Sequence, residues 1–186
     1  MSEEMIKLIL EDFDVKGEQA LLAMNAQMNK VRTGRVSPQL VNDIKVEYYG
    51  SLTPLSQVAN VNVIDNQTLK IEAWDKSAYE SVDKALRQAD VGGNPVDKGD
   101  HHLVILPVMT EERRKEMVKK VKSHGEDAKI QIRHHRRDAM VELKKIDAVS
   151  EDLIKSAEQD IQTKTDEFTR KVDSAIETKK IEVMTV

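Results

Sequence analysis

The feature that most constrains the fold is a helical period of apolar residues, which is present at both ends of the chain and absent from its middle. Near the N-terminus, apolar or small residues recur at spacings of mainly three and four: Ile6, Leu10, Phe13, Gly17, Ala20, Met24 and Val31. Such a stripe is typical of an amphipathic helix with one buried face. Glycine costs a helix interior up to about 1 kcal/mol relative to alanine, so Gly17 indicates a bend or a close helix contact.

The same period returns after Thr110, which is a favourable N-cap followed by two glutamates at the positive end of the helix dipole. The stripe then comprises Met117, Val121, Ala128, Ile132, Ala139, Leu143 and Ile146. After a break near 147–152 it continues with Ile154, Ile161, Phe168, Val172 and Ile176. A helix over 111–145 is roughly 50 Å long. Three helices that each bury one stripe predict an elongated three-helix bundle.

The middle of the chain, between Arg32 and Val108, holds all four prolines and reads as strands around one short helix. Alternating apolar residues predict strands at 44–48, 61–63, 69–73 and 103–106. Ser77 and Glu80 form a capping-box pattern ahead of a helix that ends at 92–95. The prediction is an α+β fold, in which a small α/β domain (32–105) is inserted into a helical bundle (1–31 and 106–186).

Composition narrows the compartment and the chemistry. The chain has no cysteine, which excludes disulfides and thiolate metal sites and favours a reducing location. No stretch approaches the roughly 20 apolar residues of a membrane span. The acidic start, Met1–Met5, resembles neither a secretion signal nor a transit peptide. We therefore expect a cytoplasmic protein without a membrane partner.

The charge is unevenly distributed. The net charge of −4 argues against a nucleic-acid partner, but residues 111–145 carry 12 basic and 7 acidic side chains while both flanking helices are acidic. On this helix Lys122, Lys129, Arg133 and Arg136 form one strip, with Arg137 and Lys144 on its flank. Arginine binds phosphate bidentately and releases counterions, so the strip favours a polyanion. A solvated face that pairs with the acidic helices is equally compatible with this pattern.

The histidines and carboxylates predict neither a metal site nor a reaction centre. His134 and Asp138 are one helical turn apart, but His135 points about 100° away from His134 and no third ligand has a convincing spacing. His101 and His102 precede a strand and are expected on opposite sides of it. Gly92-Gly93 lacks the context of a phosphate-binding loop. No cofactor is expected.

Four groups of residues, in chain order over nearly the whole sequence, resemble ribosome recycling factors. The first is the run Lys30-Val31-Arg32-Thr33-Gly34-Arg35-Val36-Ser37-Pro38. The second is Val46-Glu47-Tyr48-Tyr49-Gly50 with Thr53-Pro54-Leu55. The others are Thr110-Glu111-Glu112-Arg113-Arg114-Lys115 and Arg133 with Arg136-Arg137-Asp138-Ala139. His134-His135 and Val91-Gly92-Gly93 depart from the usual pattern of the family.

The resemblance implies an L-shaped molecule in which two hinge strands join the bundle to the inserted domain. The hinges fall at 32–37 and 106–108, and their principal residues are Arg32, Thr33, Gly34, Arg35 and Pro107. Gly34 is expected to use backbone angles closed to other residues, and Pro107 to stiffen its turn. The composition of the first hinge alone fits an ordinary helix stop equally well.

The resemblance also implies the function. Members of the family bind the large ribosomal subunit, with its 23S-type rRNA, after termination and split the ribosome together with GTP-bound elongation factor G. Arg133 and Arg136 match the principal rRNA contacts, and the supporting positions are Arg114, Lys122, Lys129 and Arg137. We expect a monomer that is not an enzyme. Two alternatives are a helical adaptor for an acidic protein and a hydrolase in the small domain.

Overall fold

The structure is a computed structural model that describes residues 2–147 and 149–185, without the side chain of Ser2. The chain separates into two compact units, each built from segments distant in sequence. We call Met1–Met28 with Val118–Ile181 the bundle unit, and Asn29–Met117 with Glu182–Val186 the strand unit. The predicted division into domains (1–31 with 106–186, and 32–105) remains a prediction. Among the described residues, no helix combines the length and apolarity needed to cross a membrane.

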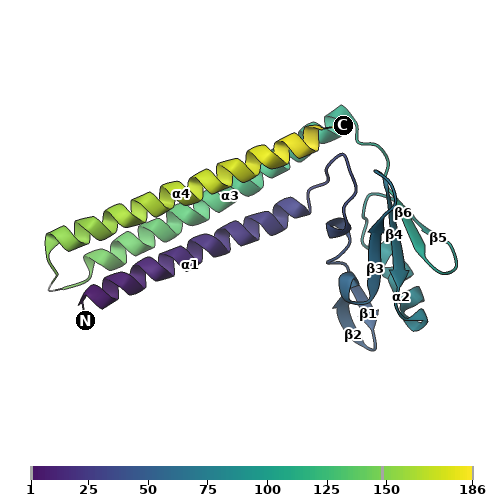
Figure 1. Cartoon of the computed structure of the whole chain (residues 1–186), viewed down its shortest axis with the longest axis horizontal. Helices are drawn as coiled ribbons and strands as arrows, with labels where there is room; N and C mark the ends of the chain where they lie inside the picture. The colour runs from purple at the N-terminus through teal and green to yellow at the C-terminus, as the bar shows by residue number, and fades with distance from the viewer. Residues whose placement is uncertain (1, 148, 186) are drawn as a thin grey trace. The chain divides into compact units, whose positions relative to one another are not determined.

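Three long helices, α1 (Ser2–Asn29), α3 (Glu111–Lys144) and α4 (Glu151–Met184), lie side by side and supply the bundle unit (Figure 1). The expected N-cap of α3 is confirmed, because the backbone N–H of Arg113 donates to Thr110 Oγ1 at 3.2 Å. Most of the predicted stripes are buried, including Phe13, Ala20, Met24, Val121, Ala128, Ile132, Leu143, Ile161, Phe168 and Val172.

Gly17 marks a close helix contact, one of the two expected alternatives. A Cβ atom added at Gly17 would lie 2.2 Å from Cε2 of Phe168. The ring of Phe168 fills this gap and meets Phe13 edge-on, with centroids 6.0 Å apart. Gly125 on α3 likewise leaves space for Ile176, whose Cδ1 would lie 2.2 Å from a Cβ atom added at Gly125. The two glycines therefore allow large side chains of α4 to approach the neighbouring helices.

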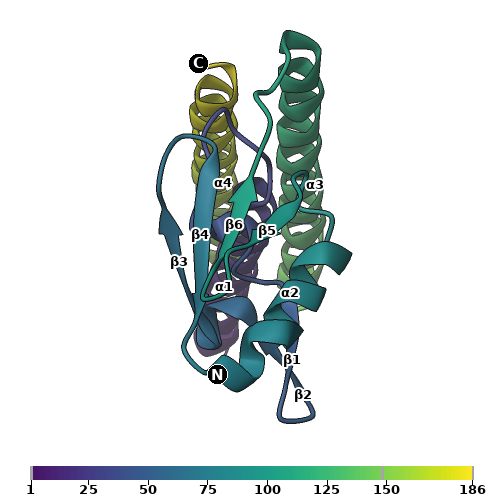
Figure 2. The same cartoon turned by 90° about the vertical axis from the view of Figure 1, so that its right-hand side faces the viewer.

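The strand unit contains a hairpin, a four-stranded antiparallel sheet and one helix. The hairpin is β1 (Lys45–Tyr48) with β2 (Ser51–Pro54), and the helix is α2 (Tyr79–Gln88). The sheet has the order β3-β4-β6-β5 and comprises β3 (Ala59–Val63), β4 (Thr68–Ala73), β6 (His102–Ile105) and β5 (Pro95–Asp97) (Figure 2). Short 3-10 turns occupy Pro38–Leu40, Leu55–Gln57 and Lys76–Ala78. The core gathers Val41, Val46, Leu55, Leu69, Ile71, Val82, Leu86 and Val104.

The predicted capping box at Ser77 is wrong. The helix α2 begins at Tyr79 and has no side-chain cap of its own. It follows the 3-10 turn, whose first N–H groups are satisfied by Asp75: a carboxylate oxygen of Asp75 accepts from the backbone N–H of Ser77 at 3.0 Å. Asp75 thus supplies the helix-initiating oxygen, two residues before the serine that the pattern favoured.

Candidate nucleic-acid interface

A groove between α3 and α4 in the bundle unit brings together most of the predicted cationic residues. It has a volume of about 710 Å³, and its lining comprises Arg133, Arg136, Arg137, Met140, Val141, Lys144, Glu158 and Gln162. Four of these side chains are cationic and one is acidic. Met140 and Val141 add an apolar surface beside the arginines. This combination of cations and apolar surface suits a nucleic-acid segment, whose phosphates and base faces need different partners.

Arg136 is the best-positioned cation of the groove. Its Nε donates to Oε1 of Gln162 on α4 at 2.8 Å, and Nε2 of Gln162 donates to Oδ1 of Asp166 at 2.9 Å. Because Gln162 is neutral, this hydrogen bond orients the guanidinium without pairing its positive charge with a carboxylate. Its two terminal amino groups have no hydrogen-bond partner among residues 2–147 and 149–185. A planar donor pair of this kind is the geometry that binds phosphate or a base edge bidentately.

Two other members of the predicted strip are partly neutralised. Arg133 Nη2 lies 2.6 Å from Oε1 of Glu126, and Lys129 Nζ lies 2.6 Å from Oδ1 of Asp173 on α4. Lys129 therefore pairs with an acidic helix, as the alternative interpretation expected, whereas Arg133 pairs with a glutamate of α3 itself. Lys122 and Arg137 are exposed and have no ion pair within the described part of the chain. The free positive charge therefore concentrates on Arg136 and Arg137, with Lys144 beside them.

Arg114, which the resemblance implied as a supporting rRNA contact, is not an exposed cation in this structure. The residue is only 7% exposed, and its Nη1 donates to the carbonyl of Met184 at 3.2 Å. The last carbonyls of a helix lack partners within the helix, and a basic side chain can satisfy them. The sequence pattern of α3 could not show that the end of α4 lies over this residue. In this structure Arg114 caps α4.

The predicted hinge residues make local contacts within the strand unit. The guanidinium of Arg32 donates to the carbonyl of Pro107, and Thr33 Oγ1 donates to the carbonyl of Arg35 at 3.0 Å. Burial, together with the nearby charge of Arg113, lowers the pKa of Arg32. Gly34 was expected to adopt backbone angles closed to other residues. This prediction is wrong, because the φ of Gly34 is not positive. An added Cβ would lie 2.8 Å from the carbonyl oxygen of Thr185, so close approach requires this glycine.

The histidine pair on α3 differs from the expected geometry. His134 Nδ1 lies 2.9 Å from Oδ2 of Asp138. Ligand atoms of His134, His135 and Asp138 all lie within 4.8 Å of one another. Helical spacing separates the two Cα–Cβ directions by about 100°, but the side-chain torsions bring the rings back together.

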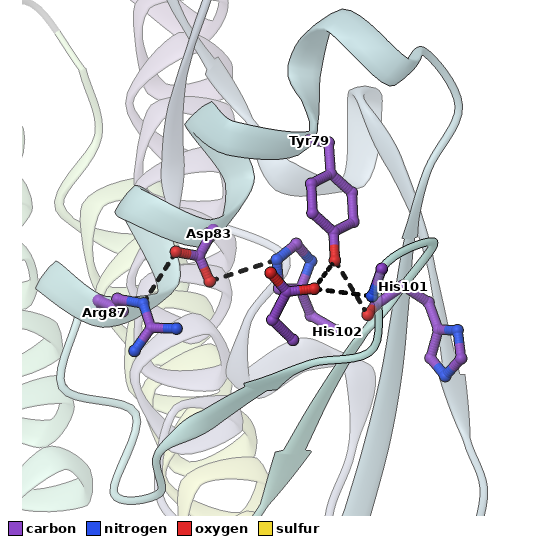
Figure 3. Close-up of polar contacts among 7 residues, drawn as sticks. Tyr79, Asp83, Arg87, His101 and His102 are labelled. Atoms are coloured by element: carbon purple, nitrogen blue, oxygen red, sulfur yellow. Dashed lines mark hydrogen bonds and ion pairs between the residues drawn. The ribbon is translucent and has the colours of Figure 1, made fainter.

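A second histidine cluster is buried in the strand unit (Figure 3). The side chain of His102 is 0% exposed; its Nε2 lies 3.3 Å from Oδ1 of Asp83, and its ring stacks on Tyr79 with centroids 4.3 Å apart. The hydroxyl of Tyr79 donates to Asp97. His101 points away from this cluster, which confirms the expected opposite sides. A histidine with a carboxylate partner is also found in catalytic dyads, but His102 has no exposed edge and is bonded to no nucleophile among the described residues.

The buried histidine makes the strand unit sensitive to acid. Burial lowers the pKa of His102 below its usual value, even though Asp83 and Asp97 oppose this effect. The unfolded chain therefore takes up the proton first as the pH falls below about 6.5, and the free energy of unfolding decreases until the lower, folded-state pKa is passed. Above about pH 6.5 this contribution is complete and constant.

Urea denaturation between pH 8 and pH 5, followed by the fluorescence of Trp74, tests whether the free energy of unfolding decreases as the pH falls. Trp74 is the single tryptophan of the chain and lies in the strand unit next to the end of β4, so it reports on the right unit. The control His102→Phe keeps a ring against Tyr79 and removes the titration, so its stability should no longer show this loss below about pH 6.5. A native protein that gains stability on acidification would contradict the argument.

The fold and the groove together define a class of protein. The chain is an α+β protein with a long helical bundle. Its cationic groove between α3 and α4 is a candidate nucleic-acid interface. The sequence model of the family described as "Ribosome recycling factor" matches residues 24–184. The chain belongs to the ribosome recycling factor family, whose members are translation factors and not enzymes.

Relatives that share nearly the whole length support this assignment. The ribosome-recycling factor of Clostridium acetobutylicum is 40% identical over 98% of this chain and 100% of its own. That of Acidovorax sp. (strain JS42) is 44% identical over 93% of this chain and 95% of its own. That of Deinococcus radiodurans is 41% identical over 96% of this chain and 98% of its own.

Two solved structures share the fold. The solution structure of a ribosome recycling factor matches with a TM-score of 0.82 and 32% identity, over 97% of this chain and 98% of the other. The second match, with a TM-score of 0.67 and 38% identity, covers 97% and 99% of the two chains. It belongs to models of the T. thermophilus ribosome recycling factor and the E. coli elongation factor G bound to the E. coli post-termination complex.

Proposed function

We propose that this chain binds the large ribosomal subunit after termination and splits the post-termination ribosome together with elongation factor G, which hydrolyses GTP. The observation that supports RNA binding is the guanidinium of Arg136 in the groove between α3 and α4. It is oriented by a hydrogen bond to neutral Gln162 and is not paired with a carboxylate. The partner is proposed from the T. thermophilus factor, which is described with elongation factor G on a post-termination complex. The chain acts as a cytoplasmic monomer.

The groove contributes affinity and orientation and performs no chemistry. Arg136 and Arg137 bind phosphate oxygens of 23S-type rRNA, and Lys144 extends the cationic edge. Arg133 and Lys129 join them by exchanging their carboxylate partners, Glu126 and Asp173, for phosphates. Each phosphate contact releases condensed counterions, so binding weakens steeply with salt. Lys122 supplies a further, more distant contact.

We place the hinge at 32–37 and 106–108. The contact of Arg32 with the carbonyl of Pro107 ties the two segments to each other, so they move as one connection. Pro107 has no N–H and a fixed φ, which limits the ways in which its segment can bend. Force from elongation factor G on the residues between these two segments would then be transmitted through them to the ends of α1 and α3.

The deciding experiment is polysome breakdown by the purified full-length protein with elongation factor G and GTP. We expect ribosomal subunits to be released only when all three are present, and not when a non-hydrolysable GTP analogue replaces GTP. Co-sedimentation with purified large subunits, in the presence of excess duplex DNA, separates specific binding from general attraction to polyanions. Failure to sediment with large subunits, or breakdown without elongation factor G, would overturn the proposal.

A further inference from the structure

The one group of three potential metal ligands within the described residues lies in the C-terminal half of α3. It consists of His134, His135 and Asp138, whose ligand atoms lie within 4.8 Å of one another. The imidazole Nδ1 of His134 already lies 2.9 Å from Oδ2 of Asp138. The two imidazole rings are 6.1 Å apart between centroids and stand at 77° to each other. The three donors therefore converge on one small volume.

This arrangement needs little adjustment to hold an ion. His134 and Asp138 are separated by one helical turn, which places them on the same face. Tetrahedral zinc with bonds of about 2.0–2.1 Å requires donor atoms roughly 3.4 Å apart. The remaining closure, from 4.8 Å to about 3.4 Å, needs only side-chain rotation, because the side chains of His134 and Asp138 are 67% and 49% exposed. The backbone is fixed within a helix of 34 residues.

We propose that His134, His135 and Asp138 form a binding site for a divalent transition-metal ion of the zinc class. Two imidazoles and one carboxylate favour Zn²⁺, Ni²⁺ or Cu²⁺ over Mg²⁺ and Ca²⁺, which prefer oxygen ligands. Three protein donors leave a further coordination position for water. Because the chelate spans one turn, the bound ion should also stiffen α3 at this point.

Charges of both signs surround the cluster. Lys16 of α1 is a positive group from another element, and it interacts electrostatically with Asp138, Glu142 and His135. Its ammonium group lies 2.6 Å from Oδ2 of Asp12, which offsets its charge. On α3 itself, Arg133, Arg136 and Arg137 add positive charge and Glu142 adds negative charge. Glu126 pairs with Arg133. The carboxylates of Asp138 and Glu142 attract the ion and offset part of this positive charge.

Calorimetric titration of Zn²⁺ into the full-length protein tests the site directly. We expect one equivalent to bind, and His134→Ala and Asp138→Asn each to weaken binding at least tenfold, since even changes beyond the direct ligands often cost about 10- to 100-fold. His124→Ala is the matched control, because His124 lies on the same helix outside the cluster, and it should leave the affinity unchanged.

Two further measurements keep the test independent of any change in folding. Zn²⁺ should shift the imidazole NMR signals of His134 and His135 and leave those of the buried His102 in place. Lys16→Met should tighten binding, because it removes a positive charge that interacts with His135 and Asp138 and it frees Asp12. Zinc that binds the His134→Ala variant as tightly as the native protein, or no detectable binding by the native protein, would overturn the proposal.

Discussion

Phe168→Ala should lower the free energy of unfolding of the bundle unit by about 3–5 kcal/mol. The side chain is 2% exposed and packs its edge against Phe13 of α1. Its ring lies over Gly17, where no Cβ fills the space, so truncation opens a cavity that the neighbouring helix cannot close. The ammonium of Lys171, 5.7 Å from the ring centroid, adds a small cation–π contribution that is lost as well.

Far-UV circular dichroism in urea measures this effect, because most of the helical signal comes from the three long helices. Trp74 fluorescence, recorded in the same samples, should change little, since it follows the strand unit. Leu153→Ala is the control: Leu153 is also on α4 but 42% exposed, and its loss should stay within about 0.5 kcal/mol. In the Phe168→Ala background Gly17→Ala should be tolerated, because its new methyl group enters the vacated space. A loss below about 1 kcal/mol for Phe168→Ala would contradict the described packing.

The long helices could be predicted from the sequence because their signal repeats many times. Each stripe places an apolar residue at every turn over some 30 positions, so single irregularities such as Gly17 do not hide the period. The N-cap at Thr110 follows from local chemistry in the same way. Features that depend on a few residues and on distant partners were much harder to predict.

The strands β2 and β5 illustrate that limit. The hairpin β1–β2 turns at Tyr49 and Gly50, which both have positive φ, as a two-residue type I′ turn requires. Tyrosine is unusual at the first position, where asparagine or aspartate signals such a turn, so the second strand was missed. The strand β5 has three residues beginning with a proline, and it exists because β6 supplies its partners. Neither strand carries a periodic pattern of its own.

In the candidate site, too, the residues that share one helix could be predicted, whereas contacts with another helix could not. The helical register placed Arg133, Arg136 and Arg137 together, and the structure puts all three in one groove. It could not reveal that Arg114 is buried under the end of α4. It also missed Gln162 and Asp166, which are polar residues on a different helix without any distinctive motif. Only the packing of α3 against α4 gives these two residues a role.

Arg136→Ala should weaken binding to the large ribosomal subunit by about 1–3 kcal/mol, equivalent to about 5- to 150-fold in the dissociation constant. The guanidinium is the one groove cation held by a hydrogen bond to a neutral partner within the described residues, so its loss removes both a charge and an oriented donor pair. The dependence of log K on log salt should become shallower by about one phosphate contact. The fold should be unaffected, since no core packing is lost.

Gln162→Ala separates the charge of Arg136 from its orientation. This variant removes the hydrogen bond that holds Nε and leaves the positive charge in the groove. We therefore expect weaker binding with an unchanged salt slope, because the number of neutralised phosphates stays the same while the guanidinium becomes mobile. Arg170→Ala, on an exposed part of α4 outside the groove, is the matched control and should bind like the native protein. Native affinity in a folded Arg136→Ala protein would remove Arg136 from the interface. An equal loss of salt slope in Gln162→Ala would instead show that Gln162 contacts RNA itself.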